Sequence, residues 1–251
     1  MSKQKKSILL PGSFFEKDSQ YKLNYLNLKN LHTVYVFDHT VNPVDFKLAM
    51  YEIKNAVSFL QNYEDRNFNI GTAVLNINKR KLDSLITKYF NPFLEIDNFK
   101  LGLGIGDNKY QENLPNYSNS LEEVIGYLFE NFELSKESRS LFLGGNSNEN
   151  IKLMKKYSIG INQWLGSIKE IYKTRDIYKE IKNPKGSISL CLNKDLALEN
   201  KIIFNDIELI YIIRESSTED YRLQIDHFFK WAFQNDRIAY DRFTFRYSYQ
   251  A

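Results

Sequence analysis

The chain has 251 residues, 43% of them hydrophobic and 26% charged, with 34 basic and 31 acidic side chains and a formal net charge of +3. This composition predicts a globular protein with a full hydrophobic core. Because basic and acidic side chains are nearly equal in number, we expect no nucleic-acid partner. The single cysteine, Cys191, excludes an intramolecular disulfide and a cysteine-built metal site, and with three histidines we expect no metal centre.

The N-terminal stretch MSKQKKSILLPG is basic but continues into only a short apolar run. No stretch approaches the roughly 18 consecutive apolar residues of a membrane-spanning helix. We therefore expect a cytoplasmic protein with neither a signal peptide nor a membrane anchor.

Eight short runs rich in β-branched and aromatic residues follow one another along the chain. Most are apolar at consecutive positions, which is the pattern of parallel strands that are covered on both faces. The predicted strands are 7–10, 33–37, 69–75, 99–105, 140–143, 159–165, 187–192 and 207–213.

Segments with helical spacing separate several of these strands. They are 44–60, 79–90, 119–132, 147–157 and 217–233, with a short candidate at 194–201. Strands and helices that alternate over this length predict an α/β protein, a (β/α)8 TIM barrel that forms one domain over residues 1–251. A doubly wound open sheet has the same alternation and stays open as an alternative. Residues 236–251 have no place in the pattern.

In a (β/α)8 barrel the active site lies at the C-terminal ends of the strands. Polar residues and glycines gather at the predicted ends. These are Pro11-Gly12, Asp38-His39, Asn76, Gly106-Asp107-Asn108, Gly144-Gly145-Asn146, Gln163-Trp164, Asn193 and Arg214-Glu215. If the barrel forms, these groups share one rim.

His39 is the histidine with a functional context. Imidazole titrates close to neutral pH, so His39 could give or take a proton, and Asp38 beside it could hold its tautomer. A capping aspartate next to a structural histidine is the alternative. We expect His32 and His227 to be structural or surface residues.

Two glycine-containing stretches could bring a ligand close to the backbone. LGLGIGDNKY (101–110) has neither the third glycine of a dinucleotide fingerprint nor the Gly-Lys-Ser/Thr of a P-loop. Its glycines would admit a flat ring with Asp107 and Asn108 beyond, or they serve tight packing inside the barrel. In LFLGGNSNENIKLMKKY (141–157), a Gly-Gly turn precedes a predicted helix. The first N–H groups of that helix would suit a phosphate. The alternative is an ordinary turn between strand and helix with a capping residue.

These segments together resemble the bacterial-luciferase-like superfamily of flavin and deazaflavin oxidoreductases. The likeness is greatest to the methylenetetrahydromethanopterin reductases, which use coenzyme F-420. Asp38-His39 resembles the family's W-x-x-D-H, NIGTAVLN (69–76) resembles its third strand L-G-T-x-V, and LGLGIGDNKY is similar to G-x-G-x-G-D-K. SLFLGGNSNENIKLMKKYSIGIN (140–162) resembles the fifth strand, glycine turn, helix and sixth strand. The likeness spans residues 7–165.

The resemblance implies a shortened luciferase-like barrel that holds an isoalloxazine or deazaflavin ring over the strand ends. It implies a cis non-prolyl bulge behind the ring at Ala73–Val74. The residues implied to contact the cofactor are Ala73, Val74, Asn108, Gly144, Gly145 and Asn146, the last three through its phosphate.

The resemblance also implies three catalytic residues and a homodimer. His39 would lie near the ring and substrate, Asp38 would support its orientation, and Asp107 would be the second acid or base. The chain departs from the family at Asn98-Phe99, where Gly-Arg is usual, and it has little likeness to the family after residue 185.

Three functions stay open on these grounds. The first is hydride transfer between coenzyme F-420 and a small-molecule carbon substrate, with a methylene-tetrahydropterin as one candidate. The second is an FMN-dependent monooxygenase of the same superfamily. The third is a barrel that binds a flavin or a protein partner without catalysis.

Overall fold

The computed structural model describes residues 4–15, 31–38, 52–63, 66–106, 113–134, 140–193, 205–214 and 221–232. Eight parallel strands form a closed barrel in the order of the sequence, so the barrel is confirmed and the open sheet is excluded. The strands are β1 Lys6–Leu10, β2 Thr33–Val36, β3 Asn69–Asn76, β4 Lys100–Gly104, β5 Ser140–Gly144, β6 Gly160–Trp164, β7 Ile188–Leu192 and β8 Ile207–Ile212. All eight predicted strands are present, and their ends differ from the prediction by no more than one residue.

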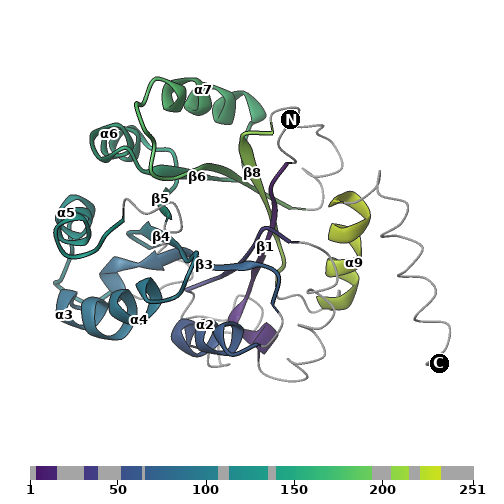
Figure 1. Ribbon diagram of the computed structural model, residues 1–251, viewed down its shortest axis with the longest axis horizontal. Coiled ribbons are helices and arrows are strands. Elements are labelled where there is room, and N and C mark those ends of the chain that lie inside the picture. Colours follow the sequence, from purple (N-terminus) through teal and green to yellow (C-terminus); the bar gives the residue numbers. More distant parts are fainter. Residues whose placement is uncertain are drawn as a thin grey trace.

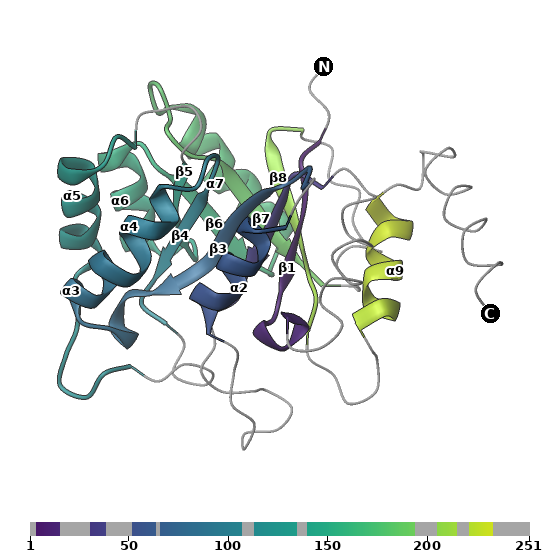
Figure 2. The ribbon, with the colours of Figure 1, turned by 60° about the horizontal axis from the view of Figure 1, so that its bottom comes forward.

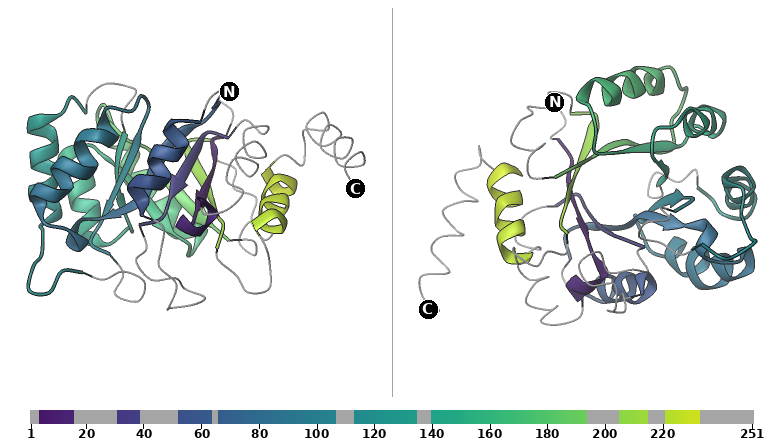
Figure 3. Two further views of the ribbon diagram at one scale, coloured as in Figure 1. Left: turned by 90° about the horizontal axis from the view of Figure 1, so that it is seen from below. Right: turned by 180° about the vertical axis from the view of Figure 1, so that it is seen from behind.

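The barrel closes where β1 pairs with β8, in a register that sets Ser7 opposite Ile210. Helices lie around the outside of the strands (Figure 1), and α9 lies beside β1 and β8, away from α5 and α6 (Figures 1, 2 and 3). The α-helices of the described residues are α2 Ile53–Gln61, α3 Leu82–Leu85, α4 Asn91–Leu94, α5 Leu121–Asn131, α6 Asn148–Tyr157, α7 Ile168–Lys179 and α9 Tyr221–Ala232, and short 3-10 helices lie at Gly12–Phe15 and Ile77–Lys79. None of them is long and apolar enough to cross a membrane.

Five of the helical predictions are found in the described part of the chain. Residues 82–94 are one continuous helical stretch, with a π-turn at Ile86–Phe90 just before Pro92, whose missing N–H cannot extend the regular ladder. The sequence patterns did not predict α7. The predicted helix at 194–201, the predicted helix starts at 44–51 and 217–220 and the tail 236–251 lie outside the described residues.

The barrel has an outer and an inner core because neighbouring strand residues point to opposite faces. The outer core packs the helices against residues such as Ile8, Val34 and Leu101. The inner core fills the barrel itself. Its buried members are Leu9, Tyr35, Phe37, Ala73, Phe142, Cys191, Ile210 and Ile212.

Glycines on β3 and β4 make room for two large rings inside the barrel. A Cβ at Gly71 would lie 2.7 Å from the Tyr35 ring, and a Cβ at Gly102 would overlap the ring of Phe142. The two rings meet edge to face, with centroids 5.8 Å apart. Gly102 therefore serves tight packing inside the barrel, which was the alternative to a role in admitting a ligand ring.

A carboxylate is buried at the end of the barrel where the strands begin. Glu208 is 1% exposed, and its Oε1 accepts hydrogen bonds from Ser7 Oγ at 2.5 Å and Tyr35 Oη at 3.1 Å. His32 Nδ1 lies 3.4 Å from the same oxygen. Burial alone would raise the pKa of Glu208, but these partners and the nearby Lys100 outweigh it and hold that pKa below its ordinary value.

Candidate active site at the C-terminal mouth of the barrel

Two aromatic rings from opposite sides of the barrel meet at its C-terminal mouth. Phe37 follows β2 and Trp164 ends β6, and three strands separate β2 from β6 on either side of the closed barrel. Their ring centroids are 5.8 Å apart, with the planes inclined at 72°. Phe37 is buried, whereas Trp164 is 44% exposed. The two rings therefore cover the barrel interior at the C-terminal ends of the strands. They form an apolar floor for a ligand at the mouth.

Val74 belongs to the same region. The peptide bond between Ala73 and Val74 is cis, at the position that the family resemblance implies, and the pairing of β3 with β4 shifts between Thr72 and Leu75. The Val74 side chain packs against two glycines: a Cβ at Gly104 would lie 2.5 Å from its Cγ2, and one at Gly144 would lie 2.7 Å from its Cγ1. The missing Cβ atoms let Val74 lie directly on the backbone of β4 and β5.

The Gly144-Gly145-Asn146 turn is held in place from behind. Gly145 has a φ of 87° and donates its N–H to the carbonyl of Asn162 at 2.8 Å. Asn150 donates to the carbonyls of Gly144 and Gly145 at 2.9 and 3.0 Å, and Asn146 Nδ2 donates to Gln163 Oε1 at 3.1 Å. The turn is thus a fixed feature at the start of α6.

A side-chain cap is also present at the start of α6. Ser147 Oγ accepts a hydrogen bond from the N–H of Asn150 at 3.2 Å. This is the capped turn that was the alternative to a phosphate site. This cap satisfies only one of the first N–H groups of the helix, so the others could still bind a phosphate. A phosphate contact at residues 144–146 is therefore compatible with the capped turn.

Asp38 is almost completely buried and forms a two-pronged ion pair with Arg80. Arg80 Nη1 lies 2.5 Å from Oδ2 and Nη2 lies 2.8 Å from Oδ1. The backbone N–H of Asn76 donates to Oδ2 at 2.9 Å, and Lys79 Nζ lies 3.4 Å from Oδ1. The end of β2 is thereby tied to the segment that follows β3.

The surroundings of Arg80 extend this contact to the outer helices. Its guanidinium lies 4.1 Å from the centroid of the Tyr89 ring, and Tyr89 Oη donates to Glu52 Oε1 at 2.9 Å. Burial alone would lower the pKa of Arg80, but the Asp38 carboxylate raises it above its ordinary value. Sequence reasoning missed Arg80 and Lys79, because nothing local links residues 79–80 to residue 38.

A group of asparagines braces the loop after β3. Asn76 Nδ2 donates to Asn113 Oδ1 at 2.9 Å, and the N–H of Asn119 donates to Asn78 Oδ1 at 2.7 Å. Asn119 Nδ2 also donates to the carbonyls of Ile77 and Arg80. The strand-end pattern picked out Asn76 and left the other three unnoticed.

Three of the predicted site residues, His39, Asp107 and Asn108, lie outside the described residues. The segments that lead to them are described. Asp38 stands at the end of β2, and Gly106, with a φ of 86°, stands just beyond β4. Both strands end at the mouth of the barrel, which is also where Ala73, Val74 and the turn at residues 144–146 lie.

Arg214 completes the described part of the mouth. It follows β8, is exposed, and its guanidinium carbon lies 5.9 Å from the centroid of the Trp164 indole. Within the described part of the chain, no three His, Cys, Asp or Glu side chains come together to hold a metal ion.

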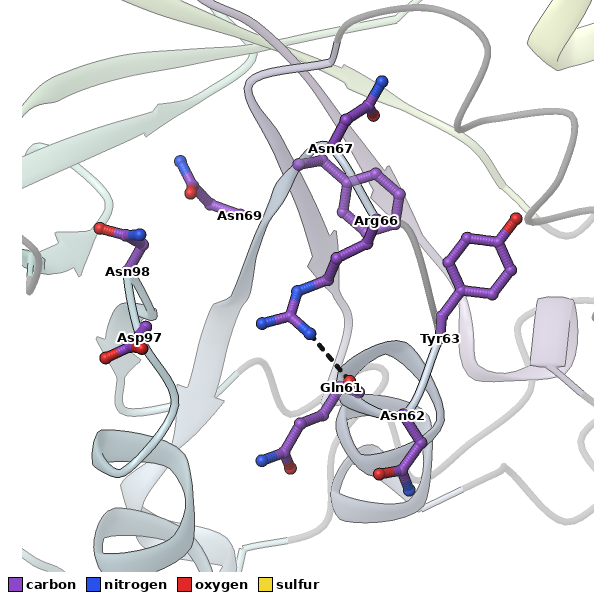
Figure 4. A pocket seen from close by; sticks show the side chains of 9 residues that line it. Gln61, Asn62, Tyr63, Arg66, Asn67, Asn69, Asp97 and Asn98 are labelled. Atoms are coloured by element: carbon purple, nitrogen blue, oxygen red, sulfur yellow. Dashed lines mark hydrogen bonds between the residues drawn. The ribbon is translucent and has the colours of Figure 1, made fainter.

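A polar pocket of about 540 Å³ lies at the opposite end of the barrel (Figure 4). It is formed by the end of α2, the start of β3 and the residues before β4, and its wall includes Arg66, which donates to the carbonyl of Gln61 at 2.8 Å. Asn98 also lines this pocket; it is one of the positions at which the sequence departs from the family that it resembles. In (β/α)8 barrels this end of the strands serves stability rather than catalysis, so the pocket is not the candidate active site.

No protein-family model matches the sequence, and no curated protein matches it either. Among solved structures, the chain is similar to an F-420-dependent secondary alcohol dehydrogenase in complex with an F-420-acetone adduct, with a TM-score of 0.55 and 12% identity over 76% of this chain and 69% of the other. It is also similar to the coenzyme F-420-dependent tetrahydromethanopterin reductase from Methanopyrus kandleri, with a TM-score of 0.52 and 12% identity over 76% and 67% of the two chains. These two likenesses show the fold, a (β/α)8 barrel that the chain shares with both F-420-dependent enzymes.

Proposed function

We propose that the chain is an oxidoreductase that transfers hydride between coenzyme F-420 and a small-molecule carbon substrate at the mouth of the barrel. The observation that carries the proposal is the apolar floor of Phe37, Trp164 and Val74 beside the turn at residues 144–146. It lies at the strand ends, where barrels of this class do their chemistry, and the fold is similar to those of two F-420-dependent enzymes.

The described residues fit a planar, largely apolar ring with a phosphate-bearing tail. Trp164 is a large aromatic surface that is 44% exposed, and Val74 lies flat on the backbone of β4 and β5. Gly144, Gly145 and Asn146 would border the phosphate at the start of α6, where the first N–H groups of the helix would bind it, since the Gly145 N–H already donates to Asn162. The coenzyme, when bound, supplies the site that gives or accepts the hydride, and the protein supplies orientation and proton management.

His39 would give or take the proton that accompanies hydride transfer, and Asp107 would be the second acid or base. General acid–base assistance of this kind contributes about 100- to 10,000-fold to a rate. Asp38 would act on His39 through the backbone, because Arg80, Lys79 and the Asn76 N–H already engage both of its oxygens. In this proposal Asp38 positions the segment that carries His39.

Turnover of the purified chain tests the proposal. The first substrates to try are secondary alcohols, because one structural neighbour is named as a secondary alcohol dehydrogenase. A methylene-tetrahydropterin is the next, because the other is named as a tetrahydromethanopterin reductase. We expect oxidised F-420 to be reduced with a secondary alcohol, or reduced F-420 to be oxidised with a methylene-tetrahydropterin. His39→Ala and Asp107→Ala should each lower that rate by about 100-fold or more while F-420 affinity stays within a few-fold. Unchanged turnover in both variants would remove these two residues from the mechanism.

Calorimetry separates the proposal from its two alternatives. Binding of F-420 but not FMN supports the deazaflavin enzyme, and the reverse supports the FMN-dependent monooxygenase. Binding of neither favours the non-catalytic barrel. Chromatography of the purified chain with light scattering tests the homodimer that the resemblance implies.

A further inference from the structure

The mouth of the barrel carries a cation that the proposed hydride chemistry does not use. Arg214 leaves the end of β8 with its side chain exposed, and its guanidinium carbon lies 5.9 Å from the centroid of the Trp164 ring. A guanidinium within about 6 Å of an indole is attracted to the ring, and its five N–H groups can still donate to other acceptors. Arg214 therefore presents a forked hydrogen-bond donor beside the exposed part of the floor.

The backbone from which this side chain extends is held by two hydrogen bonds. The N–H of Arg214 donates to Gln224 Oε1 at 2.9 Å, and Gln224 Nε2 donates to the carbonyl of Arg214 at 2.6 Å. Gln224 lies on α9 and is 8% exposed. These two bonds hold the residue at the mouth, unlike an arginine on a free surface loop.

Arg214 also differs from Arg80 and Arg175 in its charge partners. Arg80 is paired with Asp38 and Arg175 with Asp206, whereas no carboxylate of the described residues lies within 4.0 Å of the Arg214 guanidinium. Burial raises the pKa of Cys191 inside the barrel, and the positive charge of Arg214 opposes that rise. Carboxylates and phosphates match the planar fork of arginine in two-pronged hydrogen bonds.

We propose that Arg214 binds the anionic group, a carboxylate or phosphate, of the substrate, beside the Trp164 ring on which the cofactor would lie. This inference rests on the proposed function, since it names the substrate class of the same mouth. The anion site itself stands on the geometry of Arg214, Trp164 and Gln224.

The emission of Trp164 provides a test that does not need turnover. The chain has two tryptophans, so Trp231→Phe leaves Trp164 as the one reporter. We expect inorganic phosphate and acetate, titrated at constant ionic strength, to change this emission saturably. In the same background, Arg214→Gln should weaken the apparent affinity by about ten-fold or more, and Arg214→Lys by less, because lysine keeps the charge but loses the fork.

Arg66→Gln is the matched control, because it removes the same charge from the pocket shown in Figure 4. Arg66 precedes β3, so it lies at the end of the barrel opposite the mouth. This variant should leave the Trp164 response unchanged. An equal response in Arg214→Gln and its parent, or no saturable response in the parent, would overturn the anion site. Circular dichroism and the melting temperature confirm that each variant is folded.

A second arm distinguishes the anion of a substrate from the phosphate of the cofactor. The titration is repeated with F-420 at saturation. A persisting phosphate response supports a substrate anion, and a response that F-420 abolishes assigns Arg214 to the cofactor and overturns the substrate assignment. If F-420 does not bind at all, the proposed function fails, while the titration without F-420 still decides whether Arg214 binds anions.

Discussion

Arg80 and Asp38 lie 42 positions apart in the sequence and form a two-pronged ion pair at the end of β2, with distances of 2.5 and 2.8 Å. Both side chains are 6% exposed or less. Arg80→Met would leave the buried carboxylate with the Asn76 N–H and Lys79, which lies 3.4 Å away, and a loss of this kind costs about 3 kcal/mol or more. Urea unfolding should report it as a lower free energy of unfolding.

Lys156→Met is the control for this prediction. Lys156 pairs with Glu122 on the surface, where both side chains are about half exposed or more. Water and salt screen such a pair, so the urea midpoint should not move. Equal losses in the two variants would show that the buried pair does not hold the end of β2.

A methyl group added at Gly144 should strain the floor of the mouth. The new Cβ would lie 2.7 Å from Val74 Cγ1, an overlap that Gly144→Ala must relieve by moving the strand or the side chain. Overpacking of this kind costs about 1–3 kcal/mol. Adding Val74→Ala should restore part of the loss, since it removes the overlapping methyl groups.

Gly126→Ala on α5 is the matched control for Gly144→Ala. A Cβ at Gly126 would meet nothing within 4 Å, and alanine is favoured over glycine inside a helix by about 0.5–1 kcal/mol. The control should therefore be slightly stabilising in the same unfolding experiment. A Gly144→Ala variant as stable as Gly126→Ala would mean that Val74 does not fill this space.

Glu208 should contribute stability that acid removes. Its folded pKa lies below the ordinary 4.5, so its contribution is complete above that value and is lost as the pH falls through the lowered pKa. The unfolding free energy of the wild-type chain should therefore fall more steeply than that of Glu208→Gln from about pH 5 to about pH 3. Parallel pH profiles would contradict the buried charge.

Cys191 should be unreactive in the folded chain. The thiol is fully buried inside the barrel next to Asn162, and burial raises its pKa to about 12. The thiolate is the reactive form, so a maleimide should label the native protein only at the rate of unfolding and label it at once in denaturant. Rapid labelling under native conditions would show that the inner core is open.

The sequence predicted all eight strands because a parallel barrel buries both faces of each strand, and continuous apolar runs mark that condition. It did not predict α7, where two residues, Ile171 and Thr174, are buried. Charged side chains over the rest of this helix dilute the apolar periodicity. A helix is predicted from apolar residues that recur on one face, so a helix that buries only a few residues has too weak a pattern to be predicted.

The predicted strand ends identified the residues at the mouth of the barrel but not which of them contact one another. Trp164 and Arg214 were both placed at the rim from the sequence, yet the meeting of Trp164 with Phe37 depends on how far the barrel tilts and staggers as it closes. The same is true of Arg80 with Asp38 and of Glu208 with Ser7. Contacts between distant segments have no local sequence signal.

Calorimetric titration of F-420 into the full chain and into Trp164→Ala tests the central claim most directly, with Leu223→Ala as a control that truncates an exposed apolar side chain on α9. We expect the full chain and Leu223→Ala to bind alike, and Trp164→Ala to bind about ten-fold more weakly because the ring loses its aromatic support. Absence of F-420 binding by the full chain, or equal affinity in Trp164→Ala, would contradict an F-420 site on this floor.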